Sequence, residues 1–170
     1  LNFSAAGTAI TGDLDLGSAG ADDTAVTSAD ITVDATIGGD ISLVDGSNVN
    51  ADIGGTITGD INFNDTSNIT LTSDATAASF LGNNIDNSVV TLGGSVSSID
   101  IDDAVDITAT ISATSSEVLA RRVEDGVFTL SGGGGNFDFD DSDNISITSS
   151  ATASTFSAEN ITNGLRMTNS

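Results

Sequence analysis

The sequence predicts an all-β repeat protein, with a β-solenoid favoured over a duplicated β-sandwich, on three observations. First, residues 59–92 align without a gap on residues 135–168, and 14 of the 34 positions are identical. Second, half of that shift also superimposes similar residues, so the chain holds about four copies of a 38-residue unit. Third, apolar and polar residues alternate inside each unit, as they do in strands that bury one face.

This alternation predicts short strands joined by polar turns. Ile61 and Phe63 are expected to point into a core, while the asparagines beside them point outward. Residues 65–68 read Asp-Thr-Ser-Asn, and such short polar side chains favour turns. We expect five or six strands of three to five residues in each unit. The residues expected in the core are Phe63, Ile69, Leu71, Phe80, Ile85, Leu92, Ile101, Ile107, Phe139, Ile145, Ile147, Phe156 and Ile161.

The copies follow one another without a linker, which predicts a single domain over residues 1–170. Their approximate bounds are 23–60, 61–98, 99–136 and 137–170, after a partial copy at 1–22 with an inserted loop at 17–25. Residues 39–45 are also similar to residues 59–65, which suggests a second period of about half the unit. The third copy departs from the pattern at residues 117–124, where we expect a helical turn or a bulge.

The two periods distinguish the candidate architectures. A coil as long as half the unit, with three short strands, has the size of one solenoid turn, and two coils in each unit would produce both periods. A β-sandwich built by duplication explains the alternation equally well. Similar side chains at a fixed phase favour the solenoid, because stacked coils place them one above another.

The composition restricts the classes of function. The 170 residues include 25 acidic residues and three cations, giving a net charge of −22. Such a charge excludes nucleic acid as a partner and argues against an anionic membrane, and no apolar run is long enough for membrane insertion. The chain starts at Leu1 rather than Met, so we expect that a leader was removed or that the chain belongs to a longer protein.

The side chains available for catalysis are few. Histidine, lysine, tyrosine and cysteine, the usual groups for acid–base work near neutral pH, are absent. The one cluster of mixed charge contains Glu117, Arg121, Arg122 and Glu124, which we interpret as surface ion pairs. We therefore predict that the protein is not an enzyme.

Acidic residues recur in columns when the third and fourth copies are aligned. Ca²⁺ takes six to eight oxygen ligands and would offset the repulsion between stacked carboxylates. The chain has no EF-hand loop or glycine-rich calcium repeat, and a solvated acidic face is the alternative interpretation. The candidate calcium ligands are Asp100, Asp102, Asp103, Asp106, Asp138, Asp140, Asp141 and Asp143.

Threonine recurs at the outward positions of another predicted strand. Regular threonine ladders bind ice in some β-solenoids, although threonine is also an ordinary residue for the exposed side of a strand. Asp34 and Ser146 interrupt the predicted array. Its members are Thr32, Thr70, Thr72, Thr108, Thr110, Ser146 and Thr148.

The repeat resembles those of bacterial and archaeal surface proteins. The strings that carry the resemblance are Ile69-Thr-Leu-Thr, Gly93-Gly94 and Gly59-Asp-Ile-Asn-Phe. Adhesins, autotransporter passengers and acidic S-layer or filament subunits have repeats of similar composition and spacing. The resemblance implies a secreted, non-catalytic structural protein at the cell surface or in an extracellular fibre. The alternative is an adhesive or ligand-binding module that uses its acidic columns for calcium or a glycan.

The two ends of the chain stop at matching phases of the repeat. Residues 165–168 align on residues 89–92, just before a Gly-Gly turn, and the segment that begins at Ile10 aligns on the residues that follow such a turn. Unpaired strand edges at both ends would favour pairing with another copy. We therefore expect a head-to-tail homopolymer with Leu1, Phe3, Ile10, Leu165 and Met167 at the junction.

Overall fold

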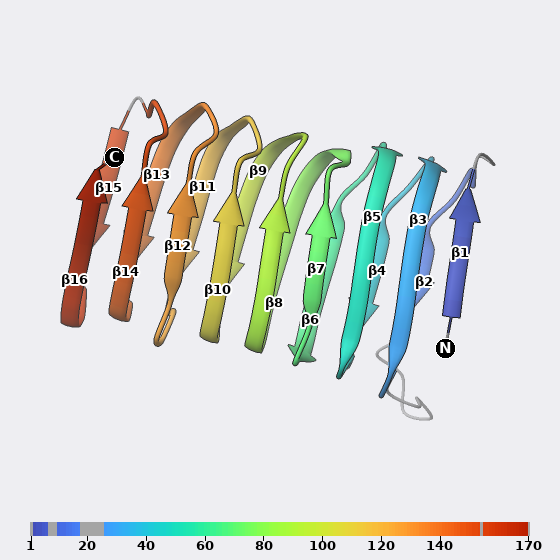
Figure 1. Cartoon of the computed structure of the whole chain (residues 1–170), viewed down its shortest axis with the longest axis horizontal. Coiled ribbons are helices and arrows are strands. Elements are labelled where there is room, and N and C mark those ends of the chain that lie inside the picture. The colour runs from blue at the N-terminus through green and yellow to red at the C-terminus, as the bar shows by residue number, and fades with distance from the viewer. Residues whose placement is uncertain (1, 7–9, 18–25, 154, 170) are drawn as a thin grey trace.

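The strands pair in parallel with the strands one coil before and after them, which makes the molecule a β-solenoid. In the computed structural model, Ala29 pairs with Val49, a separation of 20 along the sequence, and Thr70 pairs with Val89, a separation of 19. The structure describes residues 2–6 (backbone only), 10–17, 26–153 and 155–169. The coils stack along the long axis, with β1 (Asn2–Ala6) and β16 (Thr162–Asn169) at opposite ends of the molecule (Figure 1).

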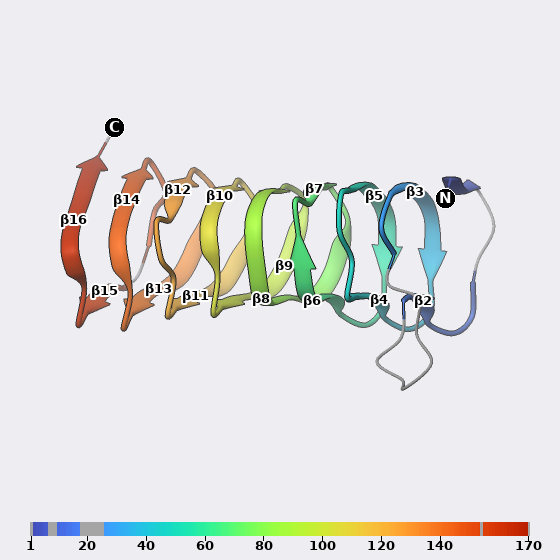
Figure 2. The same ribbon diagram turned by 90° about the horizontal axis from the view of Figure 1, so that it is seen from below.

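The strands form two stacks along this axis, and Figure 2 shows the coils from below. The first sheet contains β1, β3 (Ala29–Ile37), β5 (Val49–Ile57), β7 (Thr70–Ser73), the second half of β8 (Thr76–Leu92), β10 (Val105–Ile111), β12 (Val127–Leu130), β14 (Asp143–Ser149) and β16. The second sheet contains β2 (Leu14–Leu16), β4 (Ile41–Val44), β6 (Ile61–Ser67), the first half of β8, β9 (Ser95–Asp102), β11 (Ser115–Arg121), β13 (Gly134–Asp140) and β15 (Thr155–Glu159).

The predicted solenoid is confirmed, and the sandwich alternative is wrong because the strands pair in parallel. Two further expectations need correction. The strands are longer than the expected three to five residues, and they reach 9 residues in β3 and 17 in β8. Residues 117–124 hold no helical turn: residues 117–121 belong to β11, and Arg122 begins the next corner. Parallel stacking completes the backbone hydrogen bonds of this segment, so it needs no irregular structure.

The core lies between the two sheets and is built from the alternate residues of each strand. In β3, for example, every odd residue from Ala29 to Ile37 is buried and every even one is exposed. The predicted core is confirmed except at its C-terminal end, where Phe156 and Ile161 are only partly buried. Both belong to the last coil, on which no further coil of the described chain is stacked.

Large and small side chains alternate along one column of this core. This column reads Phe63, Gly82, Ile101, Ala120, Phe139 and Ala158 in successive coils. A methyl group at Gly82 would lie 2.5 Å from the Cδ1 atom of Ile85. Because a close-packed core has a nearly constant volume, a large residue in one coil needs a small one in the next. The 38-residue repeat therefore consists of two coils. The two coils differ in which core positions hold the bulky residues.

From β4 onward, each corner between the second and the first sheet uses two residues with positive φ, three positions apart. Asp65 (52°) and Asn68 (53°) are one such pair. Asparagine and aspartate tolerate this left-handed conformation better than other non-glycine residues. Their side chains also bond along the stack, because Asn84 donates to Asp65 over 2.6 Å and Asn87 donates to Asn68 over 2.5 Å. Arg122 is the one non-glycine residue of another type with positive φ in the part of the chain that the structure describes.

The described residues include no helix with the length and apolar character needed to cross a bilayer.

Candidate functional site

The predicted acidic columns lie on the outer face of the second sheet and at the corner beside it. Asp100 and Asp138 are not stacked directly, because Leu119 lies between them in register. Arg121 lies between Asp102 and Asp140 in the same way. Equivalent aspartates of the third and fourth copies are therefore two coils apart, about 9.5 Å at the usual strand spacing. The expected ladder of neighbouring carboxylates is interrupted by the coil between them.

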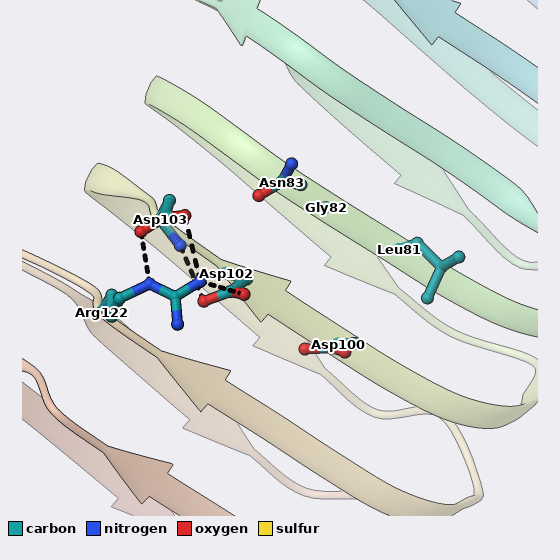
Figure 3. Close-up of a pocket in the computed structure, with 7 residues that line it drawn as sticks. All are labelled: Leu81, Gly82, Asn83, Asp100, Asp102, Asp103 and Arg122. Atoms are coloured by element: carbon teal, nitrogen blue, oxygen red, sulfur yellow. Dashed lines mark hydrogen bonds and ion pairs between the residues drawn. The ribbon is translucent and has the colours of Figure 1, made fainter.

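The two arginines of the intervening coil bind the first acidic cluster, which we define as Asp100, Asp102 and Asp103. Arg121 donates through Nη2 to both carboxylate oxygens of Asp100, over 3.0 and 2.8 Å. Arg122 donates through Nε to Asp103 over 2.6 Å and through Nη2 to Asp102 over 2.5 Å. Figure 3 shows Arg122 reaching back across one coil to these two carboxylates. The cluster is thus paired with arginines of the chain itself.

The electrostatics of this contact follow from its hydrogen bonds. The hydrogen bond from Arg122 lowers the pKa of Asp103, and the same bond raises the pKa of Arg122. A hollow of about 400 Å³ lies beside this ion pair, lined by Leu81, Gly82, Asn83, Asp100, Asp102, Asp103 and Arg122. Carboxylate and guanidinium groups side by side can bind polar ligands.

The second acidic cluster consists of Asp138, Asp140, Asp141 and Asp143, and its last three residues accept hydrogen bonds from side-chain amides. Asn160 donates to Asp141 over 3.0 Å and Asn163 donates to Asp143 over 2.9 Å. Within the described ranges, no group of three or more His, Cys, Asp or Glu side chains is arranged to hold a metal ion. Asp106 is the second left-handed residue of the corner that begins at Asp103. Calcium binding by these eight aspartates stays a prediction.

Sequence reasoning missed the partners of the arginines. It treats the cluster of mixed charge as a group within residues 117–124, whereas the observed acidic partners come from the preceding coil. The signal is present in the sequence. Aligning the sequence on itself with a shift of one coil places Arg121 opposite Asp102 and Arg122 opposite Asp103. A shift of one full 38-residue unit compares coils that are two apart, and it therefore misses these pairs.

Those predicted junction residues that the structure describes lie at the two ends of the solenoid. Leu1 lies outside the described residues, Phe3 lies in β1, and Ile10 bridges to Ile37 and packs partly buried against the core. Leu165 and Met167 lie in β16 and are 39% and 51% exposed. A hollow of about 360 Å³ at this end is lined by Phe137, Ser149, Ala151, Ala153, Phe156, Met167, Thr168 and Asn169.

The expected alignment of residues 165–168 on residues 89–92 is wrong by one residue. Thr162 pairs with Asp143, a separation of 19, but Leu165 pairs with Ile145, a separation of 20. The extra residue is taken up by an irregularity that contains Gly164, whose φ of 132° suits glycine. Arg166, rather than Leu165, therefore falls in the column of Val89, and an alignment without gaps could not show this shift.

Comparisons of the chain with known protein families, with curated proteins and with solved structures found no match in any of the three.

Proposed function

We propose that this protein is a non-catalytic structural subunit of an extracellular filament or surface layer, assembled head to tail. The observation that carries the proposal is the C-terminal end, where an apolar hollow opens beside an unpaired strand edge. Within the described chain, β16 pairs with β14 alone and β15 pairs with β13 alone. Open edges of this kind pair readily with another chain.

The side chains at this end support the same conclusion. Leu165 and Met167 continue the buried columns of Ile145 and Ile147, yet both are exposed because no further coil of the described chain covers them. Phe156 is partly buried for the same reason. Burying apolar surface yields about 25 cal/mol per Å², so a further coil placed here would be stabilised in the way that every interior coil is.

The N-terminal end offers a strand in the matching columns. Phe3 pairs with Ile31, and that column continues through Ala51, Leu71 and successive coils to Met167. Stacking β1 of a second copy on β16 would therefore place Phe3 beside Met167 and extend the first sheet in register. The contact joins two different surfaces and does not close on itself, so it produces a filament rather than a dimer.

Such a junction would be weaker than the contacts inside one subunit. Stacking β1 directly on β16 would leave one strand position open in the second sheet, between β15 and β2 of the next copy. The net charge of −22 also opposes association. We expect assembly to increase with ionic strength, which screens this repulsion, and filaments to dissociate before their subunits unfold.

The test compares two substitutions at apolar residues of equal exposure. Leu165 lies at the open end and Val105 lies on the side of the solenoid, and both are 39% exposed. Leu165→Asp should leave the protein monomeric, whereas Val105→Asp should assemble as the wild type does. Sedimentation velocity and negative-stain microscopy at high protein concentration provide the readout.

A deletion examines the other end of the junction. Removing residues 1–10 should leave monomers or short oligomers, because β1 is then missing. The proposal fails if the wild type stays monomeric at high concentration with salt and calcium present. It also fails if the deletion or Leu165→Asp still forms filaments.

A further inference from the structure

The outer face of the first sheet carries two straight rows of short side chains over five consecutive coils. We call these ten residues the threonine face: Thr70, Thr72, Val89, Thr91, Thr108, Thr110, Val127, Thr129, Ser146 and Thr148. Seven of them are exposed and three are half-buried. They lie on the strands labelled β7, β8, β10, β12 and β14, side by side in Figure 1.

The register makes this array more complete than the sequence indicated. The sequence comparison used the full repeat unit, which is two coils long, so it skipped every second coil. In the structure the strands of adjacent coils pair, and Thr91 and Thr129 lie between the threonines already identified. One row therefore contains threonine in five consecutive coils, and the next residue of that row is Thr168. Asp34 interrupts neither row, since it pairs with Gly54 in a different column.

The threonine face carries no charge in a chain with 25 acidic residues. Charged residues limit it at both ends: Asp52 precedes Thr72 in one row, and Arg166 follows Ser146 in the other. The outer face of the second sheet differs, because it carries Asp100, Asp102 and Arg121 over the same coils. A merely solvated strand face has no physical reason to exclude charge over five coils, so the neutral face suits an uncharged partner.

The geometry of the face indicates what kind of uncharged partner it fits. Adjacent strands are about 4.7–4.9 Å apart, and alternate residues of a strand are about 6.6 Å apart, so hydroxyl and methyl groups form a regular grid. β-branched side chains have few rotamers, and little entropy is lost when they are fixed against a surface. Each group contributes little, so appreciable binding requires a partner that repeats on the same length scale and contacts the whole grid together.

We propose that the threonine face binds the surface of ice. An ice plane presents water oxygens at regular intervals of a few ångströms, it is uncharged, and it contacts every coil in the same way. The hydroxyl groups of threonine can bond to this lattice, while the methyl groups of threonine and valine exclude mobile water between them. This activity is independent of head-to-tail assembly, because the face lies on the side of the solenoid and the junction lies at its ends.

The experiment measures thermal hysteresis and the inhibition of ice recrystallisation. It uses the Leu165→Asp chain, which carries an unaltered threonine face and is designed to remain monomeric. Thr129→Lys is compared with Ser97→Lys, at a position that is also exposed but lies on the second sheet. Both substitutions change the net charge by the same amount, and circular dichroism confirms that each variant is folded.

We expect the parent chain to show thermal hysteresis, Thr129→Lys to lose most of it and Ser97→Lys to keep it. No hysteresis and no recrystallisation inhibition by the folded parent would overturn the proposal, and so would equal activity in the two lysine variants. Reversible dimerisation above the freezing point that Thr129→Lys abolishes, without any activity on ice, would also overturn it. That result would identify the face as a contact between two copies of the chain.

Discussion

Phe80 and Phe156 occupy the same phase of the repeat, four coils apart, and their environments differ. Phe80 is fully buried in the middle of the solenoid, with coils stacked on both of its sides. Phe156 lies in the last coil and is only partly buried. Ile85 and Ile161 differ in the same way. The residue type is identical in each pair, so burial in this fold is provided by the next coil rather than by the residue's own coil.

The largest expected effect comes from truncating these two phenylalanines. Phe80→Ala should destabilise the protein by about 3–5 kcal/mol, as is usual for a buried phenylalanine. Phe156→Ala should cost clearly less in the monomer, because its ring is already partly in water. Denaturant unfolding of both variants measures the difference. Equal losses would contradict the comparison, whereas a cost of Phe156→Ala that grows on filament formation would strengthen it.

The next effect depends on the small residues in the same column. Gly82 of the interior corresponds to Ala158 of the last coil. Gly82→Ala places a methyl group against Ile85 and the Phe80 ring, and overpacking of this kind costs about 1–3 kcal/mol. Gly133→Ala is the matched control, because no atom lies within 4 Å of the added methyl group. Thermal unfolding should separate the two variants, and a stability of Gly82→Ala equal to wild type would refute the volume constraint.

Calcium should distinguish the interior acidic cluster from the one beside the last coil. Arg121 and Arg122 already bind the first cluster, whereas an amide, that of Asn160, faces Asp140 and Asp141. We expect calcium to raise the melting temperature through the second cluster. Asp140→Asn should therefore abolish the rise and Asp102→Asn should preserve it. A melting temperature that is the same with calcium and with chelator would contradict calcium binding.

The smallest effect is a pH dependence at the interior corner. The hydrogen bond from Arg122 lowers the pKa of Asp103 in the folded protein. A lowered pKa contributes stability above the unfolded value of about 3.9 and loses it as the pH falls through the folded value. Arg122→Gln should therefore make the fall in melting temperature below about pH 4 shallower. Arg166→Gln, in exposed β16, serves as the control and should follow the wild type.

The repeat, its period and its buried phase were readable from the sequence because stacked coils require alike residues in alike positions. The alternation around Ile61 and Phe63 predicted the core, and the similarity of residues 39–45 to residues 59–65 indicated the coil length. The strand lengths were underestimated because the corner residues resemble turn residues between separate strands. Within β8, however, residues such as Asn84 and Asn87 bend a continuous strand from one sheet to the other.

The amino-acid sequence alone is enough to identify the alternation that selects the buried face, the asparagine and aspartate corners, and the acidic charge. These are local properties, set by the side chains of one coil. Which residues become neighbours across coils is a property of the folded chain. Folding joined Arg121 to Asp100, completed the threonine row with Thr91 and Thr129, and shifted β16 by one residue at Gly164. Parallel stacking pairs each residue with one in the next coil, so a single added residue changes every later contact.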